Sequence, residues 1–540
     1  MEEQILIGKG TWIDKVADTL IKREKKLGRS LDLVWVESGL GASGIPHIGS
    51  MGDAVRAYGI ALALQNFGFK SELIAYADDM DGLRKIPHGL PDWLREHIAR
   101  PVSSIPDPFG SCHASYGAHM SSLLLDALDK VGIKYRFQSG REAYRRGILI
   151  EQIDIILKNS GKLGQKIAEF VGQDKYIEVL PYFPVCHNCG RLYTAVAQKY
   201  LPEEKKVAYV CSGSRIGNED VKGCGHKGET DIRKGEGKLA WKVEFAARWK
   251  AFDIRFEAYG KDIMDSVRVN DWVADEILGY SHPLHVKYEM FLDKSGKKIS
   301  KSAGNVLTPQ MWLRYGTPES ILLLLFKRIT GTRHVGLDDV PILMKEYDDL
   351  EDIYFGKVKV DNPAKLVKDK GLYEYINKLR PPKQPGAHIS YQLISQQAAI
   401  FPSSEDDRYD KIFNRLVTYN IVKDKTDQII QKIKLASNWA DDNMAREETF
   451  DIKLTDTQRK IVSDLIEVIK PFSKNQSTPD NAKELQSKVF DVARNNNMEP
   501  KELFTLLYRM FLNADRGPRI GNYFLDLGID RAVSVLQRYL

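Results

Sequence analysis

The amino-acid sequence predicts an α/β fold: a doubly wound, Rossmann-like parallel sheet, an insertion, and an all-α C-terminal helical bundle. A mostly apolar run at residues 31–36 precedes a glycine-rich turn and a long helical stretch, which is the order of a strand–turn–helix unit. A second strand-like run, residues 72–79, ends in carboxylates, as expected of the ligand-facing edge of such a sheet. From about residue 345 onward the pattern is almost entirely helical.

The composition is that of a globular protein with several domains. A chain of 540 residues, 43% hydrophobic and 28% charged, is expected to form roughly three or four domains. No apolar run reaches the roughly 20 residues that span a membrane, and the acidic start MEEQ lacks the pattern of a secretion signal. We therefore expect a cytoplasmic protein with no membrane partner. The net charge of +6 permits an anionic partner without requiring one.

The turn after the first strand has the features of an anion site. Gly39, Gly41 and Gly44 interrupt the apolar run, and the helical stretch starts near His47. A helix amino terminus presents free N–H groups and the positive end of its dipole to an anion. His47 adds a ring donor there, and Gly49 permits close approach. A purely structural turn is the alternative.

The segment KKISKSAGN, residues 297–305, has the features of a mobile phosphate clamp. Lysines supply mobile point charges, and hydroxyl groups donate to phosphate oxygens. Glycine on each side lets the backbone turn without a Cβ penalty. The polar residues are Lys298, Ser300, Lys301 and Ser302, and the flanking glycines are Gly296 and Gly304. On its own this pattern also fits an ordinary solvated loop.

Taken together, the two motifs resemble those of a known enzyme family. PHIGS (46–50) and KISKS (298–302) resemble the HIGH and KMSKS motifs of class I aminoacyl-tRNA synthetases. Further segments, from end to end of the chain, look like the class I lysyl-tRNA synthetase, the mainly archaeal form. These segments are ADDMDGLRKIP (77–87), IPDPFGSCHASYGAH (105–119), WKVEFAARW (241–249), FEAYGKD (256–262) and GPRIGNYFLDLG (517–528). Two positions depart from the family pattern, because Ser50 replaces the final histidine of HIGH and Ile263 replaces a histidine after GKD.

The resemblance implies a reaction in two steps. The carboxylate of lysine attacks the α-phosphate of ATP and releases pyrophosphate, and the lysyl-adenylate then acylates the terminal ribose of tRNA(Lys). Positioning and stabilisation of the charge on the phosphates would carry most of the rate. Mg²⁺ is expected to accompany ATP.

The resemblance also implies roles around ATP. The expected catalytic residues are His47, which would hold the α- and β-phosphates, and Lys298 and Lys301, which would neutralise the departing pyrophosphate. Gly260 and Asp262 resemble the ribose-binding loop of the family, with a carboxylate that only caps a loop as the alternative for Asp262. The full set expected to bind ATP is Pro46, His47, Gly49, Ser50, Gly260, Asp262, Ser300, Lys301 and Ser302.

A lysine pocket needs carboxylates or carbonyls for the ammonium and an aromatic wall for the methylene stem. The family match favours Trp241 as that wall, whereas an ordinary core aromatic is the alternative. The backbone at Gly39 and Gly41 is expected to reach the substrate. The candidate counter-charges at the strand ends are Glu37, Asp79 and Asp81.

Four cysteines predict a structural zinc site. Cys186 and Cys189 have the C-x2-C spacing of half a zinc knuckle, and Cys211 and Cys224 follow within a short, glycine-containing segment. His226 is the alternative to Cys224 as fourth ligand, and free reduced cysteines are the alternative to a metal. Such a module would gain much of its folding free energy from the ion.

A second cluster of possible zinc ligands lies within residues 107–119. Asp107, Cys112, His113 and His119 offer one carboxylate, one thiolate and two imidazoles. The C-H-x5-H spacing resembles the corresponding segment of the family, with Ser111 as an extra residue before the cysteine. A histidine pair without a metal is the alternative. The two clusters together predict two structural Zn²⁺ ions, because four protein ligands leave no open coordination position.

These motifs suggest a division of the chain into four parts. Residues 1–100 and 240–290 would form the Rossmann-like catalytic domain, interrupted by a zinc-bearing insertion at 101–239. Residues 291–345 would hold the KISKS loop and a helical connector. By resemblance, residues 346–540 would form an α-helical anticodon-binding domain that uses phosphate contacts for grip and unstacked bases for identity.

Two helix starts in the last third can be placed from the sequence. Thr455-x-x-Gln458 predicts a capping box, and Thr478-Pro479 predicts the start of another helix. The expected buried face of the first helix is Ile461, Val462, Leu465, Ile466 and Ile469.

Three other functions remain open from the sequence. A glutamyl-type class I synthetase would need a strongly cationic pocket, which the carboxylates near the turn argue against. A catalytically silent paralogue that only binds tRNA would be supported by loss of His47 or Lys301, and both are present. A nucleotidyltransferase of the same fold that does not act on tRNA would leave the helical last third unexplained. A monomer is favoured over an oligomer.

Overall fold

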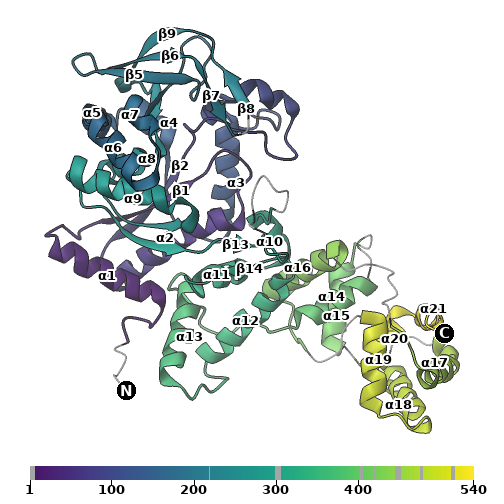
Figure 1. The fold of residues 1–540 in the computed structure, drawn as a ribbon. Coiled ribbons are helices and arrows are strands. Elements are labelled where there is room, and N and C mark those ends of the chain that lie inside the picture. Colours follow the sequence, from purple (N-terminus) through teal and green to yellow (C-terminus); the bar gives the residue numbers. More distant parts are fainter. Residues whose placement is uncertain are drawn as a thin grey trace. The chain divides into compact units, whose positions relative to one another are not determined.

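Figure 1 shows the fold in a computed structural model of the chain. The described residues are 6–540 except 218, 298, 300–305, 402, 404–405, 419–420, 444–451, 475–477, 513–516 and 518. The chain divides into two units. The first comprises Met1–Leu313 and Pro318–Gln384, and the second comprises Arg314–Thr317 and Pro385–Leu540.

Five strands form the central sheet of the first unit. They are β1 (Val34–Leu40), β2 (Ser71–Ala77), β3 (Arg136–Ser139), β11 (Ile254–Gly260) and β12 (Leu284–Tyr288). Their order is β12-β11-β1-β2-β3, and every neighbouring pair is parallel. The predicted parallel α/β sheet is therefore confirmed. The carboxyl ends of β1 and β11 lie side by side where the strand order reverses, which is where ligands bind in sheets of this kind.

The edge strand β3 extends the sheet into residues 101–239, the range predicted to be the insertion. Residues Ile74 to Ala77 of β2 pair with β3, and α3 (Tyr116–Lys130) precedes β3 in the chain. The segment that lies outside the sheet is therefore shorter than 101–239. The sequence signal for β3 is weak because the strand has four residues, of which Arg136 and Phe137 are exposed.

Helices pack on the sheet through their apolar faces. Helix α2 (Ile48–Asn66) is buried along nearly its whole length and packs against β1 and β2. Helix α8 (Trp241–Ala251) places Trp249 in one core cluster with Ile74 and Tyr76 of β2. The other helices of this part are α1 (Trp12–Lys26), α4 (Gly140–Arg145), α5 (Ile150–Lys158), α6 (Ser160–Val171), α7 (Lys175–Glu178) and α9 (Met264–Trp272).

Small antiparallel sheets follow α7 in the chain (Figure 1). Their strands are β4 (Tyr182–Pro184), β5 (Ala195–Leu201), β6 (Lys206–Cys211), β7 (Gly213–Ile216), β8 (Glu219–Lys222), β9 (Lys227–Asp231) and β10 (Gly237–Leu239). Strands β5, β6 and β9 form one sheet, β7 pairs with β8, and β4 pairs with β10. Buried and half-buried residues alternate along β6, as expected for a sheet with one face inward.

Short strands and helices follow β12. They are β13 (Phe291–Leu292), β14 (Arg333–His334), α10 (Pro309–Tyr315), α11 (Pro318–Phe326), α12 (Asp339–Tyr354) and α13 (Pro363–Ile376). The Tyr375 hydroxyl donates to Asp14 Oδ1 of α1 at 2.7 Å, and the Tyr373 hydroxyl donates to Glu351 Oε1 of α12 at 2.7 Å. These buried bonds hold α13 on the first unit. The main segment of the second unit starts at Pro385, later than residue 346, the predicted start of the helical domain.

The second unit is built from helices. They are α14 (Tyr391–Ile400), α15 (Arg408–Thr418), α16 (Asp427–Asn443), α17 (Asp456–Ile469), α18 (Pro479–Asn495), α19 (Pro500–Leu512), α20 (Ile520–Leu527) and α21 (Ile529–Gln537). Thr455 and Gln458 form a capping box at α17, and Thr478 caps α18, so both predicted helix starts are confirmed. The predicted face of α17, including Ile461 and Leu465, is buried in an apolar core.

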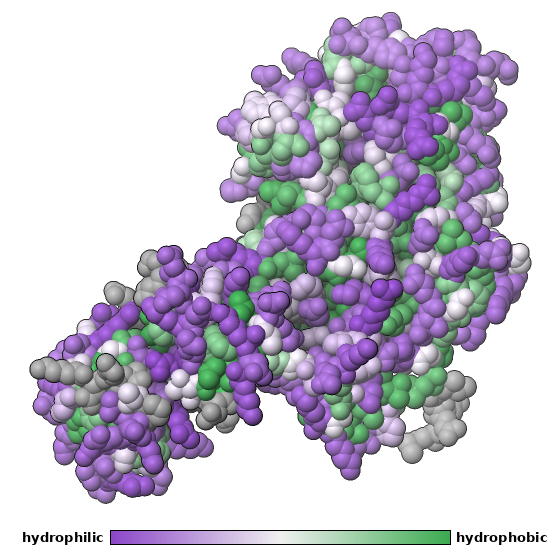
Figure 2. Space-filling view, turned by 180° about the vertical axis from the view of Figure 1, so that it is seen from behind, coloured by the Kyte–Doolittle hydropathy of each residue, from purple (hydrophilic) through white to green (hydrophobic). Residues whose placement is uncertain are grey.

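The surface is mostly polar. Figure 2 shows hydrophilic residues over most of the face seen from behind, with hydrophobic residues in small groups. Within the described parts of the chain, no helix has both the length and the apolar character needed to cross a bilayer.

Candidate active site

A cavity of about 220 Å³ lies where the strand order of the sheet reverses. Its wall combines the end of β1, the first turn of α2, the end of β11 and the residues after β12. Predicted residues from both the ATP set and the lysine set meet here. They are Gly39, Gly41, His47, Gly49, Ser50, Trp241, Gly260 and Asp262. The structure thus brings together residues that are far apart in the sequence.

His47 stands at the start of α2 and caps it with its ring. Its Nδ1 accepts a hydrogen bond from the Ser50 N–H at 3.2 Å, so the helix begins at Ile48, next to the predicted position. A neutral ring whose Nδ1 accepts carries its proton on Nε2, where it can donate. Gly49 is needed because a Cβ there would lie 2.9 Å from the His47 ring. Pro46 precedes the cap and is buried.

Ile299, inside the KISKS motif, and Leu307, which follows the motif, are both held beside the cavity. The Ile299 N–H donates at 3.2 Å to the carbonyl of Phe291, which lines the cavity. After the motif, the Leu307 carbonyl accepts from the Ile48 N–H at 2.9 Å. The predicted clamp residues themselves lie outside the described residues: Lys298, Ser300, Lys301 and Ser302. The motif is therefore anchored beside the cavity at Ile299, and the chain after it at Leu307.

Gly260 and Asp262 form a tight turn after β11. A Cβ at residue 260 would lie 2.7 Å from Asp262 Oδ1 and 3.0 Å from Met290 Sδ, so a larger residue there would displace these side chains. Ile263, one of the two departures from the family pattern, also lines the cavity and gives its wall an apolar side chain. Ser50, the other departure, lines the wall as well.

Behind the cavity, Arg248 of α8 holds three carboxylates in the interior. Its Nη2 lies 2.8 Å from Glu37 Oε1, and its Nη1 lies 2.8 Å from Asp78 Oδ1. Glu257 Oε1 lies 3.7 Å from Nη2, while Glu257 Oε2 accepts from Trp249 Nε1 at 2.6 Å. Glu37 and Arg248 are at most 1% exposed. Asp78, Glu257 and Arg248 form part of the cavity wall.

The carboxylates of this cluster outnumber the guanidinium. Burial raises the pKa of Glu37 and of Asp78, an effect that Arg248 partly offsets. Burial alone would lower the pKa of Arg248, but the neighbouring carboxylates raise it well above its ordinary value, so the guanidinium stays charged. A second cation placed in the cavity would therefore favour the ionised form of Asp78.

A second buried cluster lies next to the first. Lys238 Nζ lies 2.5 Å from Asp81 Oδ1 and 2.6 Å from Glu244 Oε2. Trp241 Nε1 donates to Asp81 Oδ1 at 3.2 Å, which orients the indole at the cavity wall. Asp81, one of the predicted counter-charges, is thus paired with Lys238 and positions Trp241.

Two predicted lysine-binding carboxylates lie away from the cavity wall. Glu37 is fully buried behind it and pairs with Arg248. Asp79 accepts from Ser139 Oγ at 2.5 Å and from the Arg141 N–H at 2.7 Å, so it fixes the start of α4. The carboxylates on the wall include Asp78 and Glu257 instead.

Sequence reasoning missed Asp78, Arg248 and Glu257. A signal for Arg248 was present, because it lies in a helix with apolar neighbours, and a charge there needs a partner. Asp78 and Asp79 follow the last residue of β2, where consecutive side chains point in different directions. The sequence alone does not decide which of them faces the cavity.

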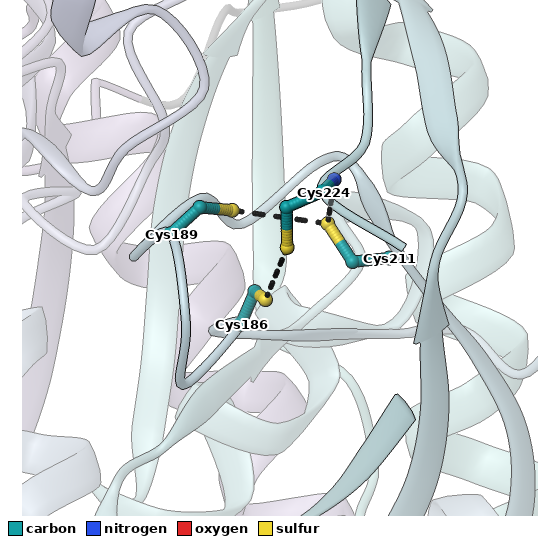
Figure 3. A group of neighbouring side chains, drawn as sticks. All are labelled: Cys186, Cys189, Cys211 and Cys224. Carbon is teal, nitrogen blue, oxygen red and sulfur yellow. Dashed lines mark hydrogen bonds between the residues drawn. The ribbon is translucent and has the colours of Figure 1, made fainter. Parts of the chain in front are cut away.

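Four cysteines converge in the predicted insertion, as Figure 3 shows. The Sγ atoms of Cys186 and Cys224 are 3.6 Å apart, and those of Cys189 and Cys211 are 3.8 Å apart. Four sulfur atoms about 2.3 Å from a central zinc ion would form a tetrahedron with edges of about 3.8 Å. The arrangement therefore fits a tetrahedral ion.

Sharp turns in the backbone bring the cysteines of this cluster together. Gly190 and Gly225 have φ angles of 70° and 77°, which permit sharp turns beside the cysteines. His226 accepts a hydrogen bond at its carbonyl from the Cys211 N–H at 2.8 Å. The four clustered ligand atoms include the Cys224 sulfur, so Cys224 takes the position for which His226 was the alternative.

The second cluster precedes and begins α3. The Nδ1 atoms of His113 and His119 are 3.1 Å apart, and both lie within 3.4 Å of Cys112 Sγ. Asp107 Oδ2 lies 3.2 Å from Cys112 Sγ and 3.2 Å from His119 Nδ1. Ligands about 2.0 to 2.3 Å from a tetrahedral zinc ion would be about 3.3 to 3.8 Å apart, close to these spacings. The extra residue Ser111 adopts a left-handed φ of 66°.

Comparisons with known proteins agree with the motifs. A family model described as tRNA synthetases class I (K) matches residues 10–378. A lysine–tRNA ligase from Cenarchaeum symbiosum (strain A) is 53% identical over 537 residues, covering 99% of this chain and 99% of the relative. Another from Methanocaldococcus jannaschii is 31% identical, with 98% and 99% covered.

Among solved structures, the glutamate–tRNA synthetase from Elizabethkingia anophelis gives a TM-score of 0.40 at 13% identity, covering 94% of this chain and 99% of that chain. That likeness is too low to carry an argument. The family model covers more than half of the chain, and the Cenarchaeum relative matches it over nearly its full length. This chain therefore belongs to the class I lysyl-tRNA synthetase family.

Proposed function

We propose that this chain is a lysine–tRNA ligase, which activates lysine with ATP and transfers it to tRNA(Lys). One observation carries the proposal. The glycine-rich turn and helix start at His47, which suit a phosphate, line the same cavity as a buried cluster in which carboxylates outnumber cations. A substrate ammonium meets complementary charge there, whereas a glutamate side chain would meet repulsion. Membership of the family supports the same reaction.

ATP would lie against the start of α2. The His47 ring, with its proton on Nε2, would donate to a phosphate, and the start of α2 would add the positive end of its helix dipole. Lys298 and Lys301 would neutralise the pyrophosphate as its bond to the α-phosphate breaks. The ribose would lie on Gly260, with Asp262 accepting its hydroxyl groups. Five residues complete the proposed ATP set: Pro46, Gly49, Ser50, Ser300 and Ser302.

Lysine would lie between Trp241 and the carboxylates held by Arg248. Its methylene stem would pack on the indole, and an ammonium would face Asp78 and Glu257 on the wall. The backbone at Gly39 and Gly41 would border the carboxylate that attacks ATP. Glu37 and Asp79, predicted to contact lysine, would act indirectly by holding Arg248 and α4.

Metal ions complete the proposal. Mg²⁺ would supply positive charge to the ATP phosphates, and it needs few protein ligands; Asp53 and Asp262 offer carboxylate oxygens on the wall. Two Zn²⁺ ions would be structural, one in each four-ligand cluster, because the spacing of the ligand atoms fits a closed tetrahedral site. The four-cysteine ion would hold the turns around β6 and β8 together.

The second unit is proposed to be the anticodon-binding domain. Its helical construction supports this role, which the resemblance implies for the last part of the chain. A cytoplasmic location and a monomeric state stay predictions.

The decisive experiment is amino-acid-dependent ATP–pyrophosphate exchange with the purified full chain, followed by charging of tRNA(Lys). We expect exchange with lysine and not with glutamate, because the interior carries surplus carboxylates. Exchange with glutamate alone would contradict the proposal. Binding of tRNA without exchange for any amino acid would favour a silent tRNA-binding protein.

A further inference from the structure

The first unit contains a second cavity, of about 630 Å³, at the other edge of the central sheet. The strands are parallel, so their amino ends share one edge and their carboxyl ends share the opposite edge. Ser71 and Arg136, which line this second cavity, begin β2 and β3. Gly39 and Gly260, near the carboxyl ends of β1 and β11, line the catalytic cavity. The two cavities are therefore separate sites.

The wall of the second cavity is strongly basic. Lys134, Arg136, Lys378 and Arg380 line it, and Glu72 is the one carboxylate among its described lining residues. Within the part of the chain that the structure describes, none of these four cations has a carboxylate partner at ion-pair distance. Like charges from distant parts of the chain repel one another, so an anion between them would relieve the repulsion.

The backbone at this wall adopts an unfavourable conformation. Lys378 and Leu379, just after α13, have φ angles of 53° and 59°. The left-handed region favours glycine, and helices commonly end in a glycine for this reason. Here two consecutive residues with side chains adopt it, and the first places a lysine on the wall. Backbone strain of this kind is characteristic of ligand clamps.

We propose that this cavity is a second anion site, which binds a small polyphosphate. The volume falls within the range of small-molecule sites, and three surplus positive charges suit an anion with several phosphate groups. Lysine and arginine both bind phosphate oxygens, and arginine does so with two parallel donors. Tyr58 and Tyr135 line the same wall; Tyr58 is buried, and the half-buried Tyr135 offers aromatic surface to a nucleotide base. The proposal is independent of the proposed reaction.

The test is hydrogen exchange of the full chain with and without inorganic triphosphate. Triphosphate should slow exchange in peptides that cover residues 132–138 and 376–381, and the double variant Lys378→Gln/Arg380→Gln should bind it at least about tenfold more weakly. The matched control is Lys345→Gln/Lys365→Gln, which removes the same charge from exposed positions on α12 and α13. The control should retain the protection. Lys134→Gln, from a different segment, should weaken binding in the same way.

ATP in place of triphosphate separates the two sources of the phosphates. Equal protection means that the phosphates suffice, and stronger protection with ATP means that Tyr135 contacts a base. The proposal is overturned if neither compound protects the two peptides, or if the control loses protection equally. Protection by tRNA alone would also overturn it and assign the wall to RNA. Lysine-dependent exchange measured on the same preparations reports separately on the proposed reaction.

Discussion

The interior behind the cavity at His47 and the interior of helices α17–α21 differ in the kind of side chain they contain. The first contains Arg248, Lys238 and their carboxylate partners, nearly all buried. The second is a core of aliphatic and aromatic side chains, such as Ile461 and Leu465 of α17 and Leu485 of α18. Apolar burial stabilises a fold directly, at about 25 cal/mol per Å². Buried charges stabilise it only when every partner is in place, so removing one partner is costly.

Metal removal should produce the largest effect in this comparison, because the ligand side chains of each cluster would lose the ion that holds them together. We expect about two zinc ions per chain, one from each four-ligand cluster. Stripping them with a strong chelator should unfold the sheets around the cysteines and leave the helical unit intact. Metal analysis and far-UV circular dichroism measure the two outcomes. A content of one ion would contradict the proposed zinc site at the Asp107 cluster, and a content of zero would contradict both proposed sites.

The second-largest effect is expected from removing the Arg248 guanidinium from the charged interior. Arg248→Leu would leave Glu37, Asp78 and Glu257 without their shared partner, at a cost of about 3–5 kcal/mol in unfolding free energy. Lysine-dependent ATP–pyrophosphate exchange should be lost as well. The control is Lys250→Leu on the same helix, whose partner Glu151 is exposed, and it should cost at most about 1 kcal/mol. Denaturant unfolding of both variants decides, and equal stability would contradict the role given to Arg248.

Lys301→Ala tests the proposed phosphate clamp of the KISKS motif. If KISKS holds the pyrophosphate as charge develops on it, turnover of lysine activation should fall roughly 100- to 1000-fold, about 3–4 kcal/mol. The affinity for ATP should change much less. Transfer from preformed lysyl-adenylate should be comparatively spared, because pyrophosphate has already left. A Lys301→Ala enzyme with normal activation would reduce the motif to a surface loop.

A cavity made in the apolar core of α17–α21 should affect the second unit alone. Ile461→Ala removes a fully buried side chain from α17 and should cost about 2–5 kcal/mol in the unfolding of the second unit. Lysine-dependent ATP–pyrophosphate exchange should stay near the wild-type rate, while tRNA charging should fall as the helical unit is destabilised. Lys460→Ala, exposed on the same helix, is the control. Removing residues 385–540 should give the same separation of exchange from charging, and unimpaired charging would show that the unit does not bind tRNA.

The smallest expected effect is a pH dependence of the charged interior. Burial raises the pKa of Asp78, so part of it is protonated in the free protein above the ordinary carboxyl range. Lysine binding would favour ionisation and release a proton, so affinity should rise with pH, by up to about tenfold per unit of pKa shift. Calorimetry in two buffers of different ionisation enthalpy measures the release. Affinity that is flat with pH would mean that Asp78 does not face the ammonium.

The same raised pKa has an opposite effect on stability. The folded protein holds more protons than the unfolded chain wherever the pH lies between the two pKa values of a buried carboxyl, so the first unit should lose stability as the pH rises through that window. The apolar core of α17–α21 supplies no such dependence.

The sequence predicted those features that rest on local rules. Strand, turn and helix around His47 follow from periodicity and glycine placement, and the capping box at Thr455 follows from residue spacing. The convergence of the cysteines also follows, because a C-x2-C pair restricts the partners that can complete it. Each of these features depends on a few residues that lie close together in the chain or share one chemistry.

The remaining features depend on tertiary packing. Arg248 and Asp78 are far apart in the chain, and their contact exists only once α8 lies on the sheet. Tyr375 gives no hint in its own segment that it will meet Asp14, although this bond holds α13 on the first unit. Strand β3 is too short and too exposed to show a clear alternation. Periodicity identifies which face of an element is buried, but not what it is buried against.

The strand order of the central sheet has a consequence for the synthesis of the protein. Strand β1 ends at Leu40, yet β11, which pairs with one of its edges, begins only at Ile254. At ~5–20 residues per second, the ribosome needs roughly 10 to 40 s to make the intervening chain. During that interval β2 can pair with β1, but the other edge of β1 has no partner from its own sheet. An enzyme that supplies amino acids for translation is thus most open to misassembly while it is itself being translated.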